Sequence, residues 1–316
     1  MDHAGTSLSE LTVDQLAIAA GRPVGVLVPV GATPEGATIE LDVADEGPRD
    51  GEVVLLVAGL GMQRTDWAPE LMVALRGAGY RTITVDNRDC GRSTVLPGMI
   101  EDLPVGEDGW PQPAYPLAAM ARDLVAVLAQ LEVDRAHVIG ISMGGMIAQH
   151  LASAHPELVA SLTSLMSTTG ATSVGQTHAE VRWVLGTPAP TEFAPYLAHA
   201  VSTATAVGSP GLVDAERVRA TATVAFARGL HPQGTTRQLL SIRADGDRTR
   251  ALAEITAPTL VVHGDADPLI DVSGGRATAS AIPDATLVVV EGLGHDLALL
   301  DPIATAILDH LAAHPV

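Results

Sequence analysis

The feature of this chain that most restricts its fold is an alternation of short apolar runs with helix-length segments, which begins near residue 51. Residues 52–58 are almost continuously apolar, as expected for a strand that is buried on both faces of a sheet. Similar runs predict further strands, at 81–85, 136–139, 159–166, 259–263 and 285–291. Helices are predicted between and after these strands, at about 66–78, 117–131, 146–152, 275–282 and up to about 313. This order predicts an α/β fold, in which right-handed crossovers join the strands of a mostly parallel central sheet flanked by helices.

The alternation is interrupted between residues 170 and 250, where the sequence has helix-like patches but no strong strand. A helical insertion between two strands of a parallel sheet predicts a cap over the carboxyl edge of the sheet, where ligands bind. At the other end of the chain, two strands are predicted at 24–30 and 37–43, and a short helix at 9–20. We therefore predict three parts, which are an N-terminal extension (1–24), a core (25–169 and 251–316) and a helical cap (170–250).

The composition narrows the kind of protein that this chain can be. Hydrophobic residues make up 47% of the sequence but include only three Trp, three Tyr and two Phe, so the core must be largely aliphatic. The formal net charge of −19 disfavours nucleic-acid binding, because phosphate backbones would be repelled. The single cysteine, Cys90, excludes an intramolecular disulfide and a thiolate-rich metal site. We expect Cys90 to fill a small buried space, and the alternative is a place beside a pocket.

Targeting and cofactor signals are missing from the sequence. No charged region followed by an apolar one opens the chain, and no apolar run reaches 18 residues, so a cytoplasmic protein without a membrane partner is expected. A phosphate-binding P-loop needs a lysine, which this chain lacks, and the zinc motif His-Glu-x-x-His does not occur. We expect no cofactor and no metal ion.

A Gly-x-Ser-x-Gly pattern at residues 140–144 lies between a predicted strand and a predicted helix. This arrangement predicts a sharp turn that exposes the hydroxyl of Ser142, with the first amides of the helix directed at whatever the oxygen attacks. Gly140 and Gly144 suit such a turn because side chains would collide where strand and helix cross closely. The pattern alone is common by chance, so the prediction depends on the residues that could activate Ser142.

A serine nucleophile needs a base and an acid that orients the base. His295 is the predicted base, because it follows a strand and a glycine-rich turn and then opens a helix at the carboxyl edge. The acid is predicted in the loop after the strand at 259–263, where Asp267 and Asp265 are both available. Asp267 is favoured because it lies beyond the strand end and Pro268 fixes its turn, and Asp265 is the alternative. The chain order Ser, Asp, His is the one found on a strand–elbow–helix scaffold.

Two backbone N–H groups are predicted to stabilise the oxyanion that forms when a serine attacks a carbonyl group. One belongs to Met143, directly after the nucleophile, and the other to Leu60, in the loop after the strand at 52–58. A plain turn between strand and helix is the alternative interpretation of that loop.

Over about residues 37–314 the chain resembles the α/β-hydrolase family. The resemblance rests on the elbow at 140–145, the turn at 263–268, the pair Gly294-His295 and the turn at 86–93, in which Asp89 stands where the family has glycine. A second departure is Ala58-Gly59, where many members have His-Gly. The loop at 59–63 and the turn at 86–93 are also similar to those of aclacinomycin methylesterase-like carboxylic ester hydrolases. Serine at the elbow excludes the aspartate nucleophile of the family's epoxide hydrolases and dehalogenases.

The resemblance implies a serine carboxylic ester hydrolase that forms an acyl-Ser142 intermediate. The predicted cap is rich in Ala, Val and Leu and carries four aromatic residues, Trp183, Phe193, Tyr196 and Phe226, which favours a small to medium, largely apolar ester. Of these, Trp183, Phe193 and Phe226 are predicted to bind the substrate. The same residues could instead serve acyl transfer, perhydrolysis, lactone opening or carbon–carbon bond hydrolysis. A ligand receptor with an idle triad is the alternative outside enzymes.

Overall fold

The computed structural model describes residues 24–33 and 35–316, so the helix expected at 9–20 lies outside the described residues. Eight strands form one sheet in the order β1-β2-β4-β3-β5-β6-β7-β8. Their bounds are β1 Val26–Ala32, β2 Thr38–Glu46, β3 Val53–Val57, β4 Arg81–Val85, β5 Ala136–Ile141, β6 Val159–Leu165, β7 Thr259–Gly264 and β8 Thr286–Val290. Strand β2 pairs antiparallel with β1 and β4, and all other pairs are parallel. The mostly parallel sheet predicted from the alternation is therefore confirmed.

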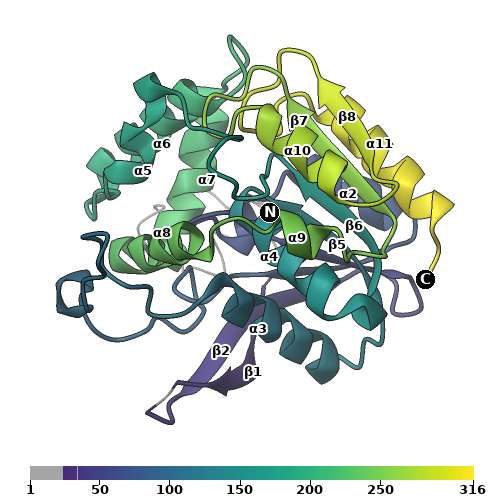
Figure 1. Cartoon of the computed structure of the whole chain (residues 1–316), viewed down its shortest axis with the longest axis horizontal. Coiled ribbons are helices and arrows are strands. Elements are labelled where there is room, and N and C mark those ends of the chain that lie inside the picture. The colour runs from purple at the N-terminus through teal and green to yellow at the C-terminus, as the bar shows by residue number, and fades with distance from the viewer. Residues whose placement is uncertain (1–23, 34) are drawn as a thin grey trace, which may run out of the picture.

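The helices flank this sheet on both faces (Figure 1). Their bounds are α2 Pro69–Gly77, α3 Leu117–Gln130, α4 Met143–Ala154, α5 Trp183–Gly186, α6 Phe193–Val207, α7 Ala215–Arg228, α8 Pro232–Asp245, α9 Thr249–Leu252, α10 Ser273–Ala281 and α11 Leu300–Ala313. Short 3-10 turns lie at Arg64–Asp66, Ile100–Asp102, Pro156–Leu158 and Ala179–Val181. The C-terminal helix α11 begins at Leu300, whereas the sequence pattern predicts a helix that opens at His295.

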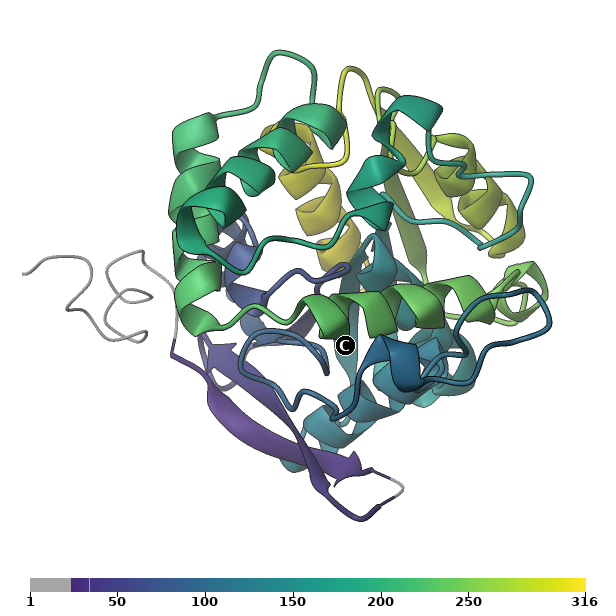
Figure 2. The ribbon, with the colours of Figure 1, turned by 90° about the vertical axis from the view of Figure 1, so that its left-hand side faces the viewer.

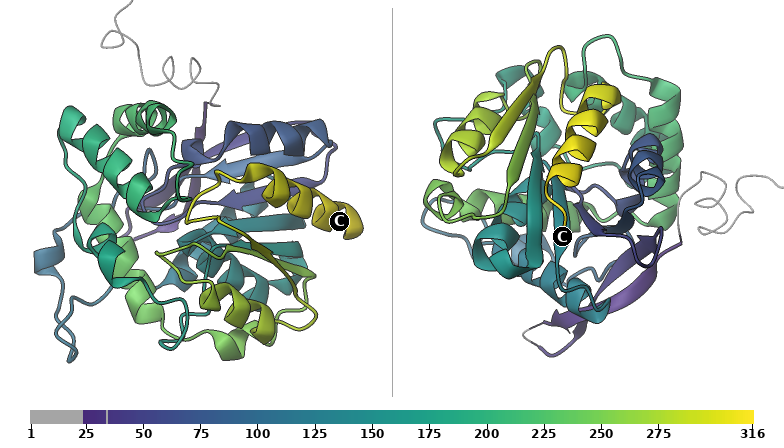
Figure 3. Two further views of the ribbon diagram at one scale, coloured as in Figure 1. Left: turned by 90° about the horizontal axis from the view of Figure 1, so that it is seen from above. Right: turned by 90° about the vertical axis from the view of Figure 1, so that its right-hand side faces the viewer.

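Helices lie on opposite faces of the sheet (Figure 3), and an aliphatic core fills the space between the sheet and the helices on each face. One core packs α3 and α4 against the sheet and includes Leu124 and Ile147, which are fully buried. The other packs α2 and α11 and includes Leu71 and Ile307. The fully buried β3 and β5 contribute alternate side chains to the two cores, which explains why their sequences are apolar at nearly every position.

Helices α5 to α8 lie between β6 and β7 in the chain and form a layer over one end of the sheet (Figure 2). Hydrogen bonds join α7 and α8 to the loops that follow β3 and β4. Gln63 donates to the carbonyl of Ala225 on α7, and on α8 Gln238 pairs with Gly61 and Arg237 with Asp89. This helical segment therefore covers the carboxyl edge of the sheet. The sequence pattern indicates helices near α5, α6 and α7 but misses α8, because α8 buries Arg237, Gln238 and Ser241 and so lacks an apolar stripe.

Candidate active site

Ser142 is the single residue between β5 and α4 and has a strained backbone, with φ 55° and ψ −121°. Few residues other than glycine adopt a positive φ, so the surrounding hydrogen bonds must hold this conformation. The Ser142 N–H donates to the carbonyl of Leu165 on β6, at 2.9 Å. Its carbonyl accepts from the hydroxyl of Ser167, also at 2.9 Å, and from the N–H of Gly145. The predicted elbow is therefore present and is fixed from the neighbouring strand.

Both glycines of the elbow are required by close backbone contacts. A Cβ atom on Gly140 would overlap the carbonyl group of Gly144, and one on Gly144 would overlap the carbonyl of Val57 at the end of β3. The Gly-x-Ser-x-Gly spacing thus lets α4 start directly against β3 and β5.

Asp267 and His295 form a hydrogen-bonded pair at the carboxyl edge. The Nδ1 atom of His295 lies 2.7 Å from Oδ2 of Asp267, whose other oxygen accepts the N–H groups of Leu269 and Ile270 at 2.9 Å each. Burial by itself would raise the pKa of Asp267, but its electrostatic interaction with His295 and the hydrogen bonds from His263 and His295 outweigh burial and hold the pKa below its usual range. Asp267 is therefore an ionised carboxylate that fixes the ring of His295.

The alternative acid, Asp265, is exposed, and none of the described hydrogen bonds joins its carboxylate to His295. Its carboxylate accepts the N–H of Gly292 at 2.7 Å and so closes the turn after β8.

The buried His263 is a second histidine beside Asp267. Its Nε2 atom donates to the carbonyl of Ile270 at 2.7 Å and lies 3.4 Å from Oδ2 of Asp267. No role for His263 is predicted from the sequence, and the one signal of it there is its place near the end of β7, four residues before Asp267.

The two predicted oxyanion donors belong to backbone segments that lie next to Ser142. A Cβ atom on Gly59 would lie 3.3 Å from the Cβ of Ser142, which places the loop after β3 directly over the elbow. Within residues 24–33 and 35–316, neither the N–H of Leu60 nor that of Met143 donates to another protein group. Met143 is the first residue of α4, where an N–H has no partner inside the helix. Both N–H groups are thus available to a bound oxyanion.

Leu60, Ile141 and His295 line one cavity of about 840 Å³ beside the elbow. Ser142 itself is half-buried and follows Ile141. The structure brings Asp267 and His295 into contact, and among the described hydrogen bonds none joins the hydroxyl of Ser142 to the His295 ring. Such contacts are often long before substrate binds.

The three aromatic residues expected to bind substrate lie elsewhere in the helical segment. Trp183, Phe193 and Phe226 are not among the described residues that line the cavity, and Trp183 and Phe193 are 38% and 45% exposed. Phe193 packs edge-on against Phe226, with ring centroids 5.1 Å apart, and so joins α6 to α7. The wall that α6 presents to the cavity consists instead of residues at helical spacing, namely Tyr196, His199, Ala200, Thr203 and Ala204.

Asp89, which replaces a family glycine, has a structural role that the sequence did not reveal. It has a φ of 67°, the conformation that glycine adopts easily. Both of its carboxylate oxygens accept hydrogen bonds from Arg237 of α8, at 2.7 and 2.9 Å, and one also accepts the hydroxyl of Tyr115 at 2.7 Å. The departure from the family pattern therefore supplies a buried anchor for α8.

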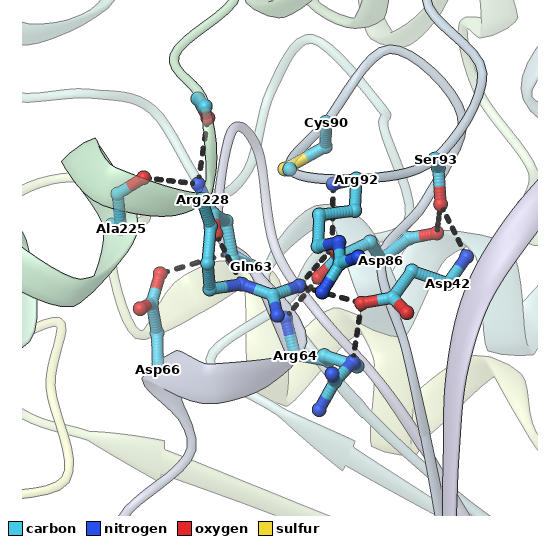
Figure 4. Close-up of polar contacts among 12 residues, drawn as sticks. Asp42, Gln63, Arg64, Asp66, Asp86, Cys90, Arg92, Ser93, Ala225 and Arg228 are labelled. Atoms are coloured by element: carbon cyan, nitrogen blue, oxygen red, sulfur yellow. Dashed lines mark hydrogen bonds and ion pairs between the residues drawn. The ribbon is translucent and has the colours of Figure 1, made fainter. Parts of the chain in front are cut away.

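Arg228, the last residue of α7, forms a second buried anchor (Figure 4). Its guanidinium group donates to Asp42 at 2.7 Å, to Asp86, and to the side-chain oxygen of Gln63 at 2.8 Å. Arg64 forms a further ion pair with Asp42, at 2.7 Å. These residues come from β2, from the loops after β3 and β4, and from α7, so the cluster joins the helical segment to the sheet.

Cys90 is 4% exposed and also lines the cavity, so it is both a small buried residue and a neighbour of the pocket. Its thiol donates to the carbonyl of Met62 at 3.3 Å, and burial raises its pKa well above the usual value.

Among the described residues, no group of three or more His, Cys, Asp or Glu could hold a metal ion. In the same part of the chain, no helix has the length and apolar character needed to span a membrane.

A mostly parallel sheet, a strained serine elbow and an Asp–His pair at its carboxyl edge define an α/β hydrolase. The chain belongs to this family, since the family with the alpha/beta hydrolase fold matches residues 52–302. It is thus an enzyme of the hydrolase superfamily.

Two relatives align over most of the chain. A candidate carbamate hydrolase, RutD of Variovorax paradoxus, is 31% identical over 253 residues, which cover 79% of this chain and 86% of RutD. Rhodomycin D methylesterase DnrP of Streptomyces peucetius is 28% identical over 287 residues, which cover 83% of this chain and 92% of DnrP.

Among solved structures, a bromoperoxidase from Bacillus anthracis superposes with a TM-score of 0.71 and 23% identity, over 91% of this chain and 99% of the bromoperoxidase. At this identity the likeness supports the fold alone.

Proposed function

We propose that this hydrolase is a serine carboxylic ester hydrolase that acts on small to medium, largely apolar esters through an acyl-Ser142 intermediate. The observation that carries the proposal is the 2.7 Å contact between Asp267 and His295, of which His295 lines a cavity beside the Ser142 elbow. Each chemical role that ester hydrolysis requires then has a residue at this edge of the sheet.

The reaction would proceed in two stages. In the first, Nε2 of His295 takes the proton of Ser142 as its oxygen attacks the ester carbonyl, and the protonated ring then gives that proton to the leaving alcohol. Asp267 stabilises the ring while it carries the charge. In the second stage, His295 deprotonates a water molecule, which attacks the acyl carbon. The bond from that carbon to the Ser142 oxygen then breaks, His295 returns its proton to this oxygen, and the acid is released. The amides of Leu60 and Met143 would hold the oxyanion in both stages, and one such donor contributes ~3 kcal/mol of transition-state stabilisation.

The choice of an ester is supported by the cavity and by the relatives. Ala200, Ala204, Leu212 and Val218 supply apolar surface on the cavity wall, and Tyr196 adds an aromatic ring. Burial raises the pKa of Tyr196, as does the nearby negative charge of Asp66, so its hydroxyl stays protonated. One relative is named for methyl ester hydrolysis and another for carbamate hydrolysis, and both reactions begin with attack on an acyl carbon.

The test is hydrolysis of p-nitrophenyl esters of increasing acyl length, beside methyl esters, lactones and a p-nitrophenyl carbamate. We expect turnover of the esters, with an initial burst of p-nitrophenol if deacylation is slow. Ser142→Ala should lower kcat/KM at least ~10³-fold, and a fluorophosphonate probe should label Ser142. Hydrolysis that survives in Ser142→Ala, or a probe adduct on another serine, would contradict the proposal.

The two aspartates of the turn after β7 provide a matched pair of variants. Asp267→Asn should lower kcat ~10³–10⁴-fold, because the amide favours the wrong tautomer of His295. Asp265→Asn changes an exposed carboxylate that closes a turn and should leave kcat within a fewfold of the parent. The opposite ranking would assign the acid to Asp265.

A further inference from the structure

The loop that carries Leu60 is a tight turn whose middle peptide is held from outside the loop. The N–H of Met62 donates to the carbonyl of Gly59 at 3.2 Å, so Leu60 and Gly61 are the central residues of the turn. Gly61 has a φ of 64°. In turns of this length, the peptide between the two central residues can take two opposite orientations, which define different turn types. The N–H of Gly61 reports which orientation is present.

Gln238 of α8 accepts that N–H. Its Oε1 atom lies 2.9 Å from the nitrogen of Gly61, and its Nε2 atom donates to the carbonyl of Arg88 at 2.8 Å. The side chain is completely buried, so both ends of the amide are committed. One turn earlier on the same face of α8, Thr235 packs against Gly61, where a Cβ atom would lie 3.0 Å from its hydroxyl oxygen.

The other hydrogen bonds to this loop act at its ends. Asn87 donates to the carbonyl of Ala58 at 2.9 Å, and the Cys90 thiol donates to the carbonyl of Met62. Both fix carbonyl groups at the two ends of the turn. The middle peptide joins the carbonyl carbon of Leu60 to the nitrogen of Gly61. Among the described residues, Gln238 alone accepts the N–H of this peptide.

We infer that Gln238 is a positioning residue for the oxyanion loop, so that a helix inserted between β6 and β7 sets the geometry of the reaction at the end of β3. The inference rests on the proposed function, in which the Leu60 amide stabilises the oxyanion. Gln238 touches no reacting atom in this mechanism. It acts by keeping the turn at 59–62 in one form, so that the free N–H of Leu60 and that of Met143 converge on the same point before substrate binds.

The test compares Gln238→Met with Ser241→Ala. Ser241 is a matched control, because it is also fully buried on α8, and its hydroxyl donates to the carbonyl of Tyr115 at 2.6 Å without contacting the loop. With a p-nitrophenyl ester, Gln238→Met should lower kcat and kcat/KM together ~10–100-fold with KM nearly unchanged, as expected when only transition-state contacts are lost. Binding of a boronic acid, which mimics the tetrahedral intermediate, should weaken by a similar factor. Ser241→Ala should keep kcat within about twofold, because the cost of its lost hydrogen bond falls on folding stability.

Rescue separates positioning from simple packing. Gln238→Glu keeps an oxygen that can accept the Gly61 N–H in either protonation state, so it should retain more of the kcat than Gln238→Met. If Gln238→Met does not fold, Gln238→Ser replaces it. The smaller side chain lets water reach the Gly61 N–H and the Arg88 carbonyl, the two former partners of Gln238. A fall in kcat of at least ~5-fold is then expected. A folded Gln238→Met or Gln238→Ser variant whose kcat and boronic acid affinity match those of Ser241→Ala overturns the inference. The proposed function is tested separately, by Ser142→Ala. If Ser142→Ala is inactive, the proposed function stands even when the Gln238 variants overturn the inference. If Ser142→Ala is active, the proposed function itself is contradicted.

Discussion

Helices α7 and α8 are joined to the loops after β3 and β4 by the buried arginines Arg228 and Arg237, whereas no residue of α5 or α6 in the described chain forms an ion pair. Burial follows the same division. Helix α6 has 15 residues, of which only Val207 is buried, while α8 buries five of its 14 residues. Helix α6 packs mainly on α7, through aromatic contacts of Phe226 with Phe193 and Tyr196.

The difference indicates two tasks within one helical segment. The anchored half holds the loop that carries Leu60, through Gln238 and through the contact of Gln63 with Arg228. The less buried half supplies one wall of the cavity, including Tyr196 and His199. Its C-terminal end is fixed beside the site, because the N–H of His295 donates to the carbonyl of Val207 at 2.7 Å. Substrate selection can therefore vary on α6 without disturbing the groups that would perform the chemistry.

The largest expected effect is on the anchor of α7. Arg228→Met leaves Asp42 and Asp86 buried with one cation fewer and should lower the free energy of unfolding by ~3–5 kcal/mol, measured by urea denaturation. Arg217, on the same helix, is the matched control, because its pair with Glu70 is about half exposed. Arg217→Met should cost ~1 kcal/mol or less. Equal losses in the two variants would show that the buried cluster is no anchor.

The anchor of α8 should be replaceable by the residue that the family uses. Arg237→Met alone should cost ~2–4 kcal/mol, because Asp89 loses the cation that bonds both of its oxygens. The double variant Arg237→Met with Asp89→Gly removes the stranded charge and relieves the positive φ, so it should be more stable than Arg237→Met by ~1–3 kcal/mol. A double variant no more stable than Arg237→Met would contradict this account of Asp89.

The comparison also predicts a difference in local opening. Amide hydrogens of α6 should exchange at least ~10-fold faster than those of α7 and α8, since few buried contacts resist opening of α6 alone. Hydrogen exchange followed by mass spectrometry resolves these helices in the intact protein. Uniform protection over residues 193–245 would mean that α6, α7 and α8 open as one unit and that the two halves do not differ.

The smallest expected effect is on substrate choice. Tyr196→Ala enlarges the cavity wall and should shift the ratio of kcat/KM between long and short p-nitrophenyl esters by ~3–10-fold. Phe193→Ala, one turn away on α6, removes a ring that packs on Phe226 outside the cavity lining and should leave this ratio nearly unchanged. A larger shift in Phe193→Ala would return substrate selection to the aromatic residues expected from sequence alone.

Much of the fold was predictable, because burial on both faces makes a parallel strand apolar at almost every position. Strand β4 occupies the predicted residues, and the other strands after residue 51 agree within about two residues at each end. The elbow was predictable for a steric reason, since the glycines at 140 and 144 leave little choice of turn around Ser142. Helix α8 is missing from the sequence-based prediction because most of its buried side chains are polar and Leu240 is the one large apolar residue among them, so their burial leaves no apolar periodicity in the sequence.

The sequence alone determined the sheet, the elbow, and the positions at which a nucleophile, an acid and a base would follow three strand ends. These features are encoded locally, in runs and turns of fewer than about ten residues. Only the tertiary structure decided that Arg237 bonds Asp89, 148 residues earlier, and that Gln238 bonds Gly61, 177 residues earlier. It also decided that Tyr196 rather than Phe193 faces the cavity. A sequence pattern records whether a side chain is buried, but the identity of its partner depends on how distant segments pack together.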